Sequence, residues 1–294
     1  MHAELLAGVH AALVTPFDAD DGIRLEAVAA NVERLNRSGL CGYWVNGEFR
    51  LLSVKERLAV LGAVLAHRAP GKVVIAGCTA EGTRQAVELA RRAARMGAEL
   101  ASLSVPCSYL RWVTAAVVER HLRAVADASP IPVVLYNNPA QAAGLGLPPE
   151  VLHRLATHPN LAGLKDSGAD WAERIQAASP RFAVTAGAPA FTLELLRRGG
   201  AGAILTTANI FPAACVRLYE AFREGRAADG EDLARRLTAV HAQTSGAFGV
   251  AGVKAAMELV GLAGGAPRRP YLALEPPQAA MVRRAIEESG LLER

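Results

Sequence analysis

Eight short apolar runs, rich in β-branched residues, recur along the chain and alternate with amphipathic helical patterns. Their length and composition are typical of buried strands. They cover residues 9–15, 42–46, 73–77, 100–105, 132–137, 161–165, 182–186 and 202–206. Segments between them carry apolar residues at the i, i+3, i+4 and i+7 spacing of a helix, as in 25–38, 54–67, 83–96 and 114–128. This alternation predicts parallel strands covered by helices.

Repetition of the strand–helix unit eight times predicts an α/β fold of the closed (β/α)8 type, the TIM barrel. A doubly wound open sheet is the alternative, but the glycine-rich fingerprint expected after its first strand is absent from Val14-Thr15-Pro16-Phe17. Three further helices are expected at 228–244, 253–260 and 277–288. We therefore expect residues 1–225 to form the barrel and residues 226–294 to form a C-terminal helical extension packed on it.

Composition restricts the class of protein. The 294 residues are 51% hydrophobic, so the chain can bury a large core. The net charge of +4 comes from basic residues interspersed with acidic ones, which argues against a nucleic-acid partner. The apolar stretch 5–14 is too short to span a bilayer and lacks the basic start of a leader peptide, so no membrane segment is expected. The four cysteines have no metal-ligand spacing, and we expect reduced thiols in a cytoplasmic protein without a metal.

Lys165 is the strongest candidate for a reacting group. In a (β/α)8 barrel such groups lie where strands end, and Lys165 ends the apolar run 161–164. Lysine is scarce in this chain, which has only Lys55, Lys72, Lys165 and Lys254. Burial at the barrel mouth would lower the pKa of the amine and leave it neutral, able to attack a ketone. A lysine that reaches solvent, or that pairs with Asp166, is the alternative.

Two other strand ends carry candidate polar groups. Tyr136 ends the strand that precedes Lys165 along the chain, so the phenol and the amine are expected on the same face, where the phenol could move protons. It could also be an amphipathic rim residue. Asn46-Gly47-Glu48 ends the second strand with a glycine, which lets backbone N–H groups point at a carboxylate. A tight turn at the glycine is the alternative to this binding role. Glu48 could act as a base, and its alternative is a carboxylate that starts a helix or fixes the loop.

Three ordered motifs at these strand ends resemble the dihydrodipicolinate synthase and N-acetylneuraminate lyase family. They are Asn46-Gly47-Glu48-Phe49 with Leu52-Ser53 and Glu56-Arg57, then Leu135-Tyr136-Asn137-Asn138-Pro139, then Gly163-Leu164-Lys165-Asp166-Ser167. The likeness extends over almost the whole chain, including the closing helices and the Arg269-Pro270-Tyr271-Leu272 turn.

The resemblance implies class I aldolase chemistry, in which Lys165 forms an imine with pyruvate or with a 2-oxo acid that yields pyruvate. Tyr136 would be the proton shuttle. The backbone amides that bind the 2-oxo acid's carboxylate in the family map onto Val45 and Asn46, beside Gly47. The carbonyl that contacts the lysine after the eighth strand maps onto Ile204. Members are usually homotetramers and use no metal or organic cofactor, so the expected partners are a 2-oxo acid, an aldehyde and further copies of this chain.

Departures from the family pattern concern the second substrate, the proton relay and the contact with a neighbouring subunit. The synthase branch has an arginine two residues after the proline of its Y-N-x-P motif, and Gln141 stands there in this chain. Val45-Asn46 replaces a hydroxyl-bearing pair, so the threonine of the family's proton relay has no counterpart. Of the usual tyrosine pair after the fourth strand only Tyr109 remains, as a candidate to reach a neighbouring subunit's site.

Within the family, N-G-E-F, the P-C-x-Y stretch, S-P-I-P-V-V-L-Y and H-P-N most resemble 4-hydroxy-2-oxoglutarate aldolase. Two alternatives stay open at this point. One is a synthase or dehydratase of the same family. The other, of a different class, is a non-catalytic relative that binds a 2-oxo acid without turning it over.

Overall fold

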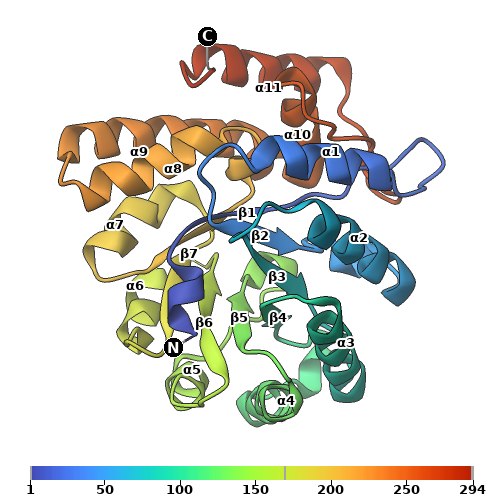
Figure 1. Ribbon diagram of the computed structural model, residues 1–294, viewed down its shortest axis with the longest axis vertical. Helices are drawn as coiled ribbons and strands as arrows, with labels where there is room; N and C mark the ends of the chain where they lie inside the picture. The colour runs from blue at the N-terminus through green and yellow to red at the C-terminus, as the bar shows by residue number, and fades with distance from the viewer. Residues whose placement is uncertain (1, 169, 293–294) are drawn as a thin grey trace.

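The computed structural model describes residues 2–168 and 170–292 and contains one closed barrel of parallel strands. The strands are β1 (Gly8–Ala12), β2 (Gly42–Val45), β3 (Val73–Gly77), β4 (Leu100–Ser104), β5 (Val133–Asn137), β6 (Leu161–Asp166), β7 (Ala183–Ala186) and β8 (Gly202–Leu205). Each strand pairs with the next along the chain, and β8 pairs with β1 (Figure 1). The predicted TIM barrel is confirmed, and the doubly wound alternative is wrong because the sheet has no edge.

Helices follow the strands and surround the barrel (Figure 1). They are α1 (Leu25–Leu35), α2 (Val54–His67), α3 (Thr83–Met96), α4 (Ala115–Ala128), α5 (Pro149–Leu155), α6 (Trp171–Arg174), α7 (Thr192–Arg197) and α8 (Pro212–Arg223). Short 3₁₀ turns lie in the loops, at η1 (Ala3–Leu6), η2 (Phe49–Leu51), η3 (Leu110–Trp112), η4 (Pro139–Gln141), η5 (Ile175–Ala177), η6 (Pro189–Phe191) and η7 (Thr207–Asn209).

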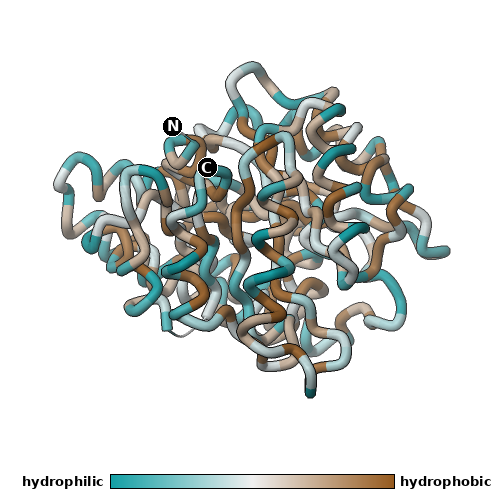
Figure 2. Tube along the Cα trace, turned by 90° about the horizontal axis from the view of Figure 1, so that it is seen from below, coloured by the Kyte–Doolittle hydropathy of each residue, from teal (hydrophilic) through white to brown (hydrophobic). Residues whose placement is uncertain are grey.

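Two apolar clusters form the core. The larger one lies between the strands and the helices and includes Val45, Leu135 and Leu164. The smaller one fills the inside of the barrel, with Trp44 and Ile204 among its members. Alternate residues of each strand therefore face opposite sides of the barrel wall. Hydrophobic stretches accordingly gather in the middle of the molecule and hydrophilic ones at its outer turns (Figure 2).

A plug closes the barrel at the amino ends of the strands. The 3₁₀ turn η1 precedes β1, and its Leu6 is fully buried within the inner cluster. A Cβ added at Gly163 would lie 2.2 Å from the carbonyl oxygen of Ala183 on β7 and 2.7 Å from Leu6 Cδ1, so the glycine leaves room for both the neighbouring strand and the plug. Apolar packing therefore closes this end of the barrel, and the open end is the one where the strands finish.

The C-terminal helices are α9 (Ala227–His241), α10 (Ala247–Leu259) and α11 (Pro276–Glu288), and they gather on one side of the barrel beside α8 and α1 (Figure 1). A π-helical turn, η8 (Ala242–Gly246), joins α9 to α10. The predicted start of α10 at residue 253 was six residues late, because Gly249 interrupts the helix only locally, with φ 56° and ψ −141°. The division into residues 1–225 and 226–294 stays a prediction, and residues 293–294 lie outside the described ranges.

Residues 260–275, which connect α10 to α11 and are called the strap below, are fastened to the barrel. Asn31 on α1 exchanges two hydrogen bonds with the backbone of Ala263. Gly265 adopts φ 69°, and a Cβ there would lie 2.7 Å from Phe17 backbone atoms, so only glycine lets the strap approach the segment after β1 so closely.

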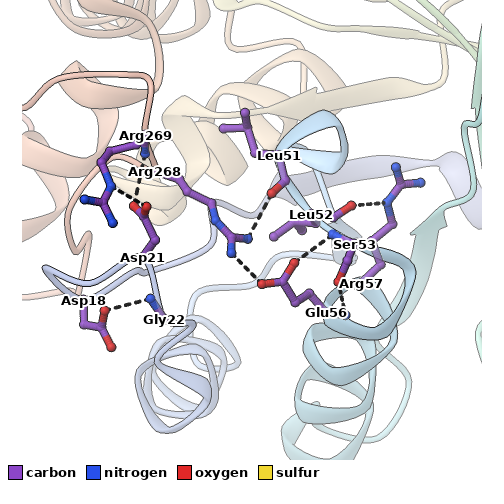
Figure 3. Close-up of polar contacts among 10 residues, drawn as sticks. All are labelled: Asp18, Asp21, Gly22, Leu51, Leu52, Ser53, Glu56, Arg57, Arg268 and Arg269. Atoms are coloured by element: carbon purple, nitrogen blue, oxygen red, sulfur yellow. Dashed lines mark hydrogen bonds and ion pairs between the residues drawn. The ribbon is translucent and has the colours of Figure 1, made fainter.

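Two arginines anchor the next part of the strap (Figure 3). Arg268 donates to the carbonyl of Leu51 at 2.9 Å and to Glu56 Oε1 at 2.6 Å. Arg269 donates to Asp21 Oδ2 at 2.6 Å. Glu56 also completes the capping box of α2 with Ser53. The loops after β1 and β2 and the strap thus form one connected rim.

No helix in residues 2–168 and 170–292 is long and apolar enough to cross a membrane. The four cysteines are free thiols, with Cys78 and Cys215 buried and Cys41 exposed.

The Arg268–Glu56 pair predicts a specific pH dependence of stability. The hydrogen bond from Arg268 is the largest cause that lowers the pKa of Glu56 from 4.5 to about 2. A lowered folded pKa adds stability that is present above the unfolded pKa and is lost as pH falls through the folded one. We expect Arg268→Met to lower the free energy of unfolding by about 1 kcal/mol at pH 7, with the difference from wild type shrinking between pH 4.5 and about 2.

Urea denaturation at a series of pH values measures this difference. Arg269→Met is the matched control, because Arg269 is far more exposed than Arg268 and its pair with Asp21 should contribute less. A difference for Arg268→Met that does not change with pH would contradict the assignment to Glu56.

Candidate active site

A cavity of about 400 Å³ opens at the end of the barrel where the strands finish. We call it the inner cavity. It is lined by residues from the ends of several strands and from α9, η8 and α10, among them Trp44, Glu48, Tyr136, Asn138, Gln141, Lys165, Ser167, Gly187, Thr206, His241, Ser245 and Val250. The predicted position of the reacting groups, at the strand ends, is thus the position of a real cavity.

Lys165 lies at the base of the inner cavity, between two aromatic rings. Its backbone pairs directly with that of Tyr136 in the β5–β6 ladder. The amine lies 4.5 Å from the centroid of the Tyr136 ring and 4.9 Å from that of Trp44. The two rings meet edge to face, with centroids 5.4 Å apart. Lys165 is only 4% exposed, so its amine is held in an aromatic pocket at the barrel mouth.

The alternative roles of Lys165 do not fit this geometry. A lysine that is 4% exposed does not extend into solvent. Asp166 is the next residue on the strand and so faces the other side of the wall, where its Oδ1 accepts from Asn137 Nδ2 and from the Gly168 amide, each at 2.8 Å. In the described part of the chain no carboxylate forms an ion pair with Lys165.

Burial lowers the pKa of Lys165 from 10.5 to about 7. The two ring faces attract the protonated amine and oppose this shift, but such attraction contributes about 0.5–2 kcal/mol, equivalent to about one pKa unit. Desolvation therefore dominates, and the nucleophilic neutral amine is well populated near neutral pH.

The lowered pKa predicts a pH profile for reaction with a ketone. The neutral fraction of Lys165 should rise about tenfold per pH unit below 7 and level off above it. We expect the rate at which pyruvate and borohydride modify Lys165 to follow this curve. A rate that keeps rising tenfold per unit up to pH 10 would mean an ordinary alkylamine and contradict the burial argument.

The hydroxyl of Tyr136 is surrounded by polar side chains. It accepts from Asn138 Nδ2 at 2.7 Å and lies 3.5 Å from Gln141 Oε1. Burial raises the pKa of Tyr136, while hydrogen bonds with Asn138 and Ser167 oppose the rise. Tyr136 and Lys165 face the same cavity, as predicted, and the phenol has neighbours through which a proton can pass.

The turn after β2 is held rigidly beside the inner cavity. Asn46 has φ 65°, a left-handed conformation that asparagine tolerates, and its side chain donates to the carbonyl of Arg57. Arg57 is buried and donates to the carbonyls of Phe49, Leu52 and Thr79. Gly47 lines the inner cavity, whereas the Val45 side chain packs in the outer core. At these positions only backbone groups, with Gly47, are available to a ligand.

Glu48 forms a buried ion pair with Lys254 of α10. Glu48 Oε2 accepts from the Thr15 amide at 2.7 Å, and Oε1 lies 3.6 Å from Lys254 Nζ. Lys254 is 1% exposed and donates to the carbonyls of Thr15 and Ala266. Burial raises the pKa of Glu48 and lowers the pKa of Lys254, and each charge opposes the shift of the other. Of the interpretations of Glu48, the loop-fixing carboxylate matches these contacts.

Removing one partner of this pair should be costly. Lys254→Met leaves a buried carboxylate without its cation, and we expect the free energy of unfolding to fall by about 3–5 kcal/mol. The double variant Lys254→Met/Glu48→Gln removes both charges and should recover part of the loss. Urea denaturation measures the loss in each single variant, Lys254→Met and Glu48→Gln, and in the double variant. If the loss in the double variant equals the sum of the two single losses, the pair is not coupled.

Of the remaining predicted site residues, one lines the inner cavity, one packs inside the barrel and one lies at the surface. Gln141 lines the inner cavity beside Tyr136. Ile204 packs inside the barrel within the inner cluster. Tyr109 has φ 55° and is 83% exposed, outside the cavity of its own chain. Glu81 fixes its loop by accepting from the amides of Cys107 and Ser108. The structure thus brings Lys165, Tyr136, Gly47 and Gln141 together, but not Tyr109.

Three important residues were missed in the sequence. Lys254 carried a usable signal, because it is one of four lysines and stands in the apolar run Val253-Lys254-Ala255. Trp44 alternates along β2 with Tyr43 and Val45, which pack in the outer core, and strand parity could have placed it inside the barrel. Ser167 had no signal of its own, since only folding brings its hydroxyl to Tyr136.

Comparison with known proteins identifies the family. Residues 5–289 match the sequence pattern of the dihydrodipicolinate synthetase family. The chain belongs to this family. It is 36% identical to a probable 4-hydroxy-2-oxoglutarate aldolase, mitochondrial, of Emericella nidulans, over 99% of this chain and 97% of that one. It is 34% identical to an N-acetylneuraminate lyase of Rhizobium meliloti, over 96% and 94% of the two chains.

The fold is shared with solved members of the family. The structure of YagE from E. coli, a protein of the dihydrodipicolinic acid synthase family in complex with pyruvate, matches with a TM-score of 0.89 and 26% identity. The match covers 97% of this chain and 99% of YagE. The resemblance inferred from the motifs is therefore confirmed, and with it the assignment to carbon–carbon lyases of the class I aldolase type.

Proposed function

We propose that the protein is a pyruvate-dependent aldolase in which Lys165 is the nucleophile. The observation that carries the proposal is the buried amine, whose pKa is lowered to about 7, at the base of a cavity at the barrel mouth. As a neutral amine it attacks the ketone carbon of pyruvate, and loss of water from the carbinolamine leaves an imine.

Carbon–carbon bond formation follows from the imine. Loss of a proton from the methyl carbon gives an enamine, and this carbon attacks the carbonyl carbon of an aldehyde. The carbonyl π electrons become an alkoxide that takes up a proton, and water then releases a 4-hydroxy-2-oxo acid and the free amine. Cleavage is the same sequence in reverse. Tyr136 supplies and removes the protons, supported by its position over the amine.

Ser167 and Asn138 support this role of Tyr136 in the absence of a hydroxyl at position 45. Both contact the phenol from the loops after β5 and β6. In this proposal Val45 and Asn46 contribute their backbone amides to the carboxylate of the 2-oxo acid, beside Gly47, and the carbonyl of Ile204 would contact the lysine. Gln141 faces the second substrate. Among 2-oxo acids, 4-hydroxy-2-oxoglutarate is the first to test, since the Emericella nidulans relative is named for it.

Borohydride reduction in the presence of pyruvate tests the nucleophile. We expect the mass of the reduced adduct on the peptide that contains Lys165, and no adduct in Lys165→Ala. Lys55→Ala, which removes an exposed lysine, is the control and should still be labelled. Pyruvate release from 4-hydroxy-2-oxoglutarate should likewise be lost only in Lys165→Ala. Label on another lysine would overturn the proposed nucleophile.

Borohydride labelling and pyruvate release together also separate the alternative functions. A non-catalytic relative would be stabilised by pyruvate but would release none from a 4-hydroxy-2-oxo acid. A synthase or dehydratase would form the imine without cleaving this substrate. The cytoplasmic location and the homo-oligomer, in which Tyr109 reaches a neighbouring copy, stay predictions. The exposure of Tyr109 and Trp112 on the loop after β4 is consistent with such a contact.

A further inference from the structure

A second chamber of about 470 Å³ lies beside the inner cavity at the barrel mouth. We call it the outer chamber. Both spaces are lined by Gly47 and Glu48 after β2, Ala140 and Gln141 after β5, and Gly249 and Val250 of α10. The two spaces are therefore adjacent, and a molecule that reacts at Lys165 lies next to the outer chamber.

The walls of the outer chamber are largely apolar. One wall is η2, with Phe49 and Leu51, and a second is the start of α10, with Phe248 and Val250. The third is the strap, which contributes Tyr271 and Leu272. Tyr271 is 57% exposed and Leu272 is 78% exposed, so a ligand that covers them removes apolar surface from water.

The strap wall is held in place. Arg268 and Arg269, which only Pro270 separates from Tyr271, are tied to Leu51, Glu56 and Asp21 (Figure 3). The arginine contacts join the strap to η2, which forms the facing wall. The chamber is therefore formed before a ligand arrives, which limits the ordering cost of binding.

The described lining of the two spaces contains few cationic side chains that could bind a second carboxylate. Among the described lining residues, the cationic side chains are Lys165, which the imine consumes, and Arg50. Arg50 pairs with Glu81 at 3.1 Å and lies over the Phe49 ring. Glu48 is paired with Lys254, and burial lowers the pKa of His241, which keeps it neutral. Among the described lining residues, a second carboxylate would therefore find no unpaired cationic side chain.

We propose that the outer chamber binds the distal part of the aldehyde partner and that this part is uncharged and apolar, such as an alkyl or aryl group. The inference rests on the proposed aldolase function and specifies its second substrate. Glyoxylate, the aldehyde released from 4-hydroxy-2-oxoglutarate, reacts within the inner cavity and leaves the outer chamber empty. A longer apolar aldehyde fills both, so the gain in binding comes from the walls of the outer chamber.

Propanal and 3-phenylpropanal are matched probes, since they share the reacting end and differ by a phenyl group. With saturating pyruvate, kcat/KM should be at least about tenfold higher for 3-phenylpropanal than for propanal, as expected for burial of a phenyl group. It should also exceed the value for glyoxylate. Chromatography of the 4-hydroxy-2-oxo acid products measures all three reactions.

Wall variants locate the effect. Leu272→Ser and Tyr271→Ser are surface substitutions that leave the fold intact, and each should raise KM for 3-phenylpropanal about fourfold or more without changing the kinetics with propanal. Leu25→Ser, at an exposed leucine that lines neither space, is the control and should leave all three aldehydes unaffected.

Three results would overturn the inference: equal kcat/KM for the two matched aldehydes, a preference for glyoxylate, or wall variants that affect propanal as strongly as 3-phenylpropanal. Borohydride trapping with pyruvate on the same samples distinguishes failure of the outer-chamber assignment from failure of the aldolase function. If Lys165 is labelled but the aldehydes are not discriminated, only the assignment of the outer chamber fails. If Lys165 is not labelled, the aldolase function fails and the inference with it.

Discussion

Desolvation of one amine is the constraint on which the site depends. Lys165 is uncharged near neutral pH because the barrel encloses it, the plug at Leu6 closes the floor, and the rings of Trp44 and Tyr136 cover its sides. A closed barrel is suited to this purpose, since all its strands end at one rim and can surround a single point with side chains from several loops. An open sheet would leave the amine accessible to water from one side.

The rim around this amine is fastened by charges that are themselves buried or half-buried. Lys254 crosses from α10 to the segment after β1 and to the strap, and Glu48 joins it from the turn after β2. Arg268 repeats the pattern nearer the surface by tying the strap to η2. Pairing of buried charges fixes position strongly because an unpaired alternative is so unfavourable. The backbone groups at Gly47 and the walls of the outer chamber are therefore in place before substrate binds.

Much of this could be predicted from the sequence, and the misses have physical causes. The first and last residues of strand β3 and of helices α2 and α3 were predicted correctly, because their apolar periodicity is strong and local. The start of α10 was predicted late, since a cluster of glycines usually ends a helix, whereas here only Gly249 departs from helical geometry. Lys165 and Tyr136 were predicted from their strand-end positions, which the barrel brings to one rim.

The sequence by itself determined the number and order of the strands, the position of Lys165 at a strand end and membership of the family, because periodicity and local motifs depend on neighbours along the chain. Only the tertiary structure decided the partners that lie far apart in sequence. Glu48 meets Lys254, Tyr136 meets Ser167, and Leu51 meets the strap through Arg268. The burial that sets a pKa, and the adjacency of two cavities, arise only when distant segments exclude water together.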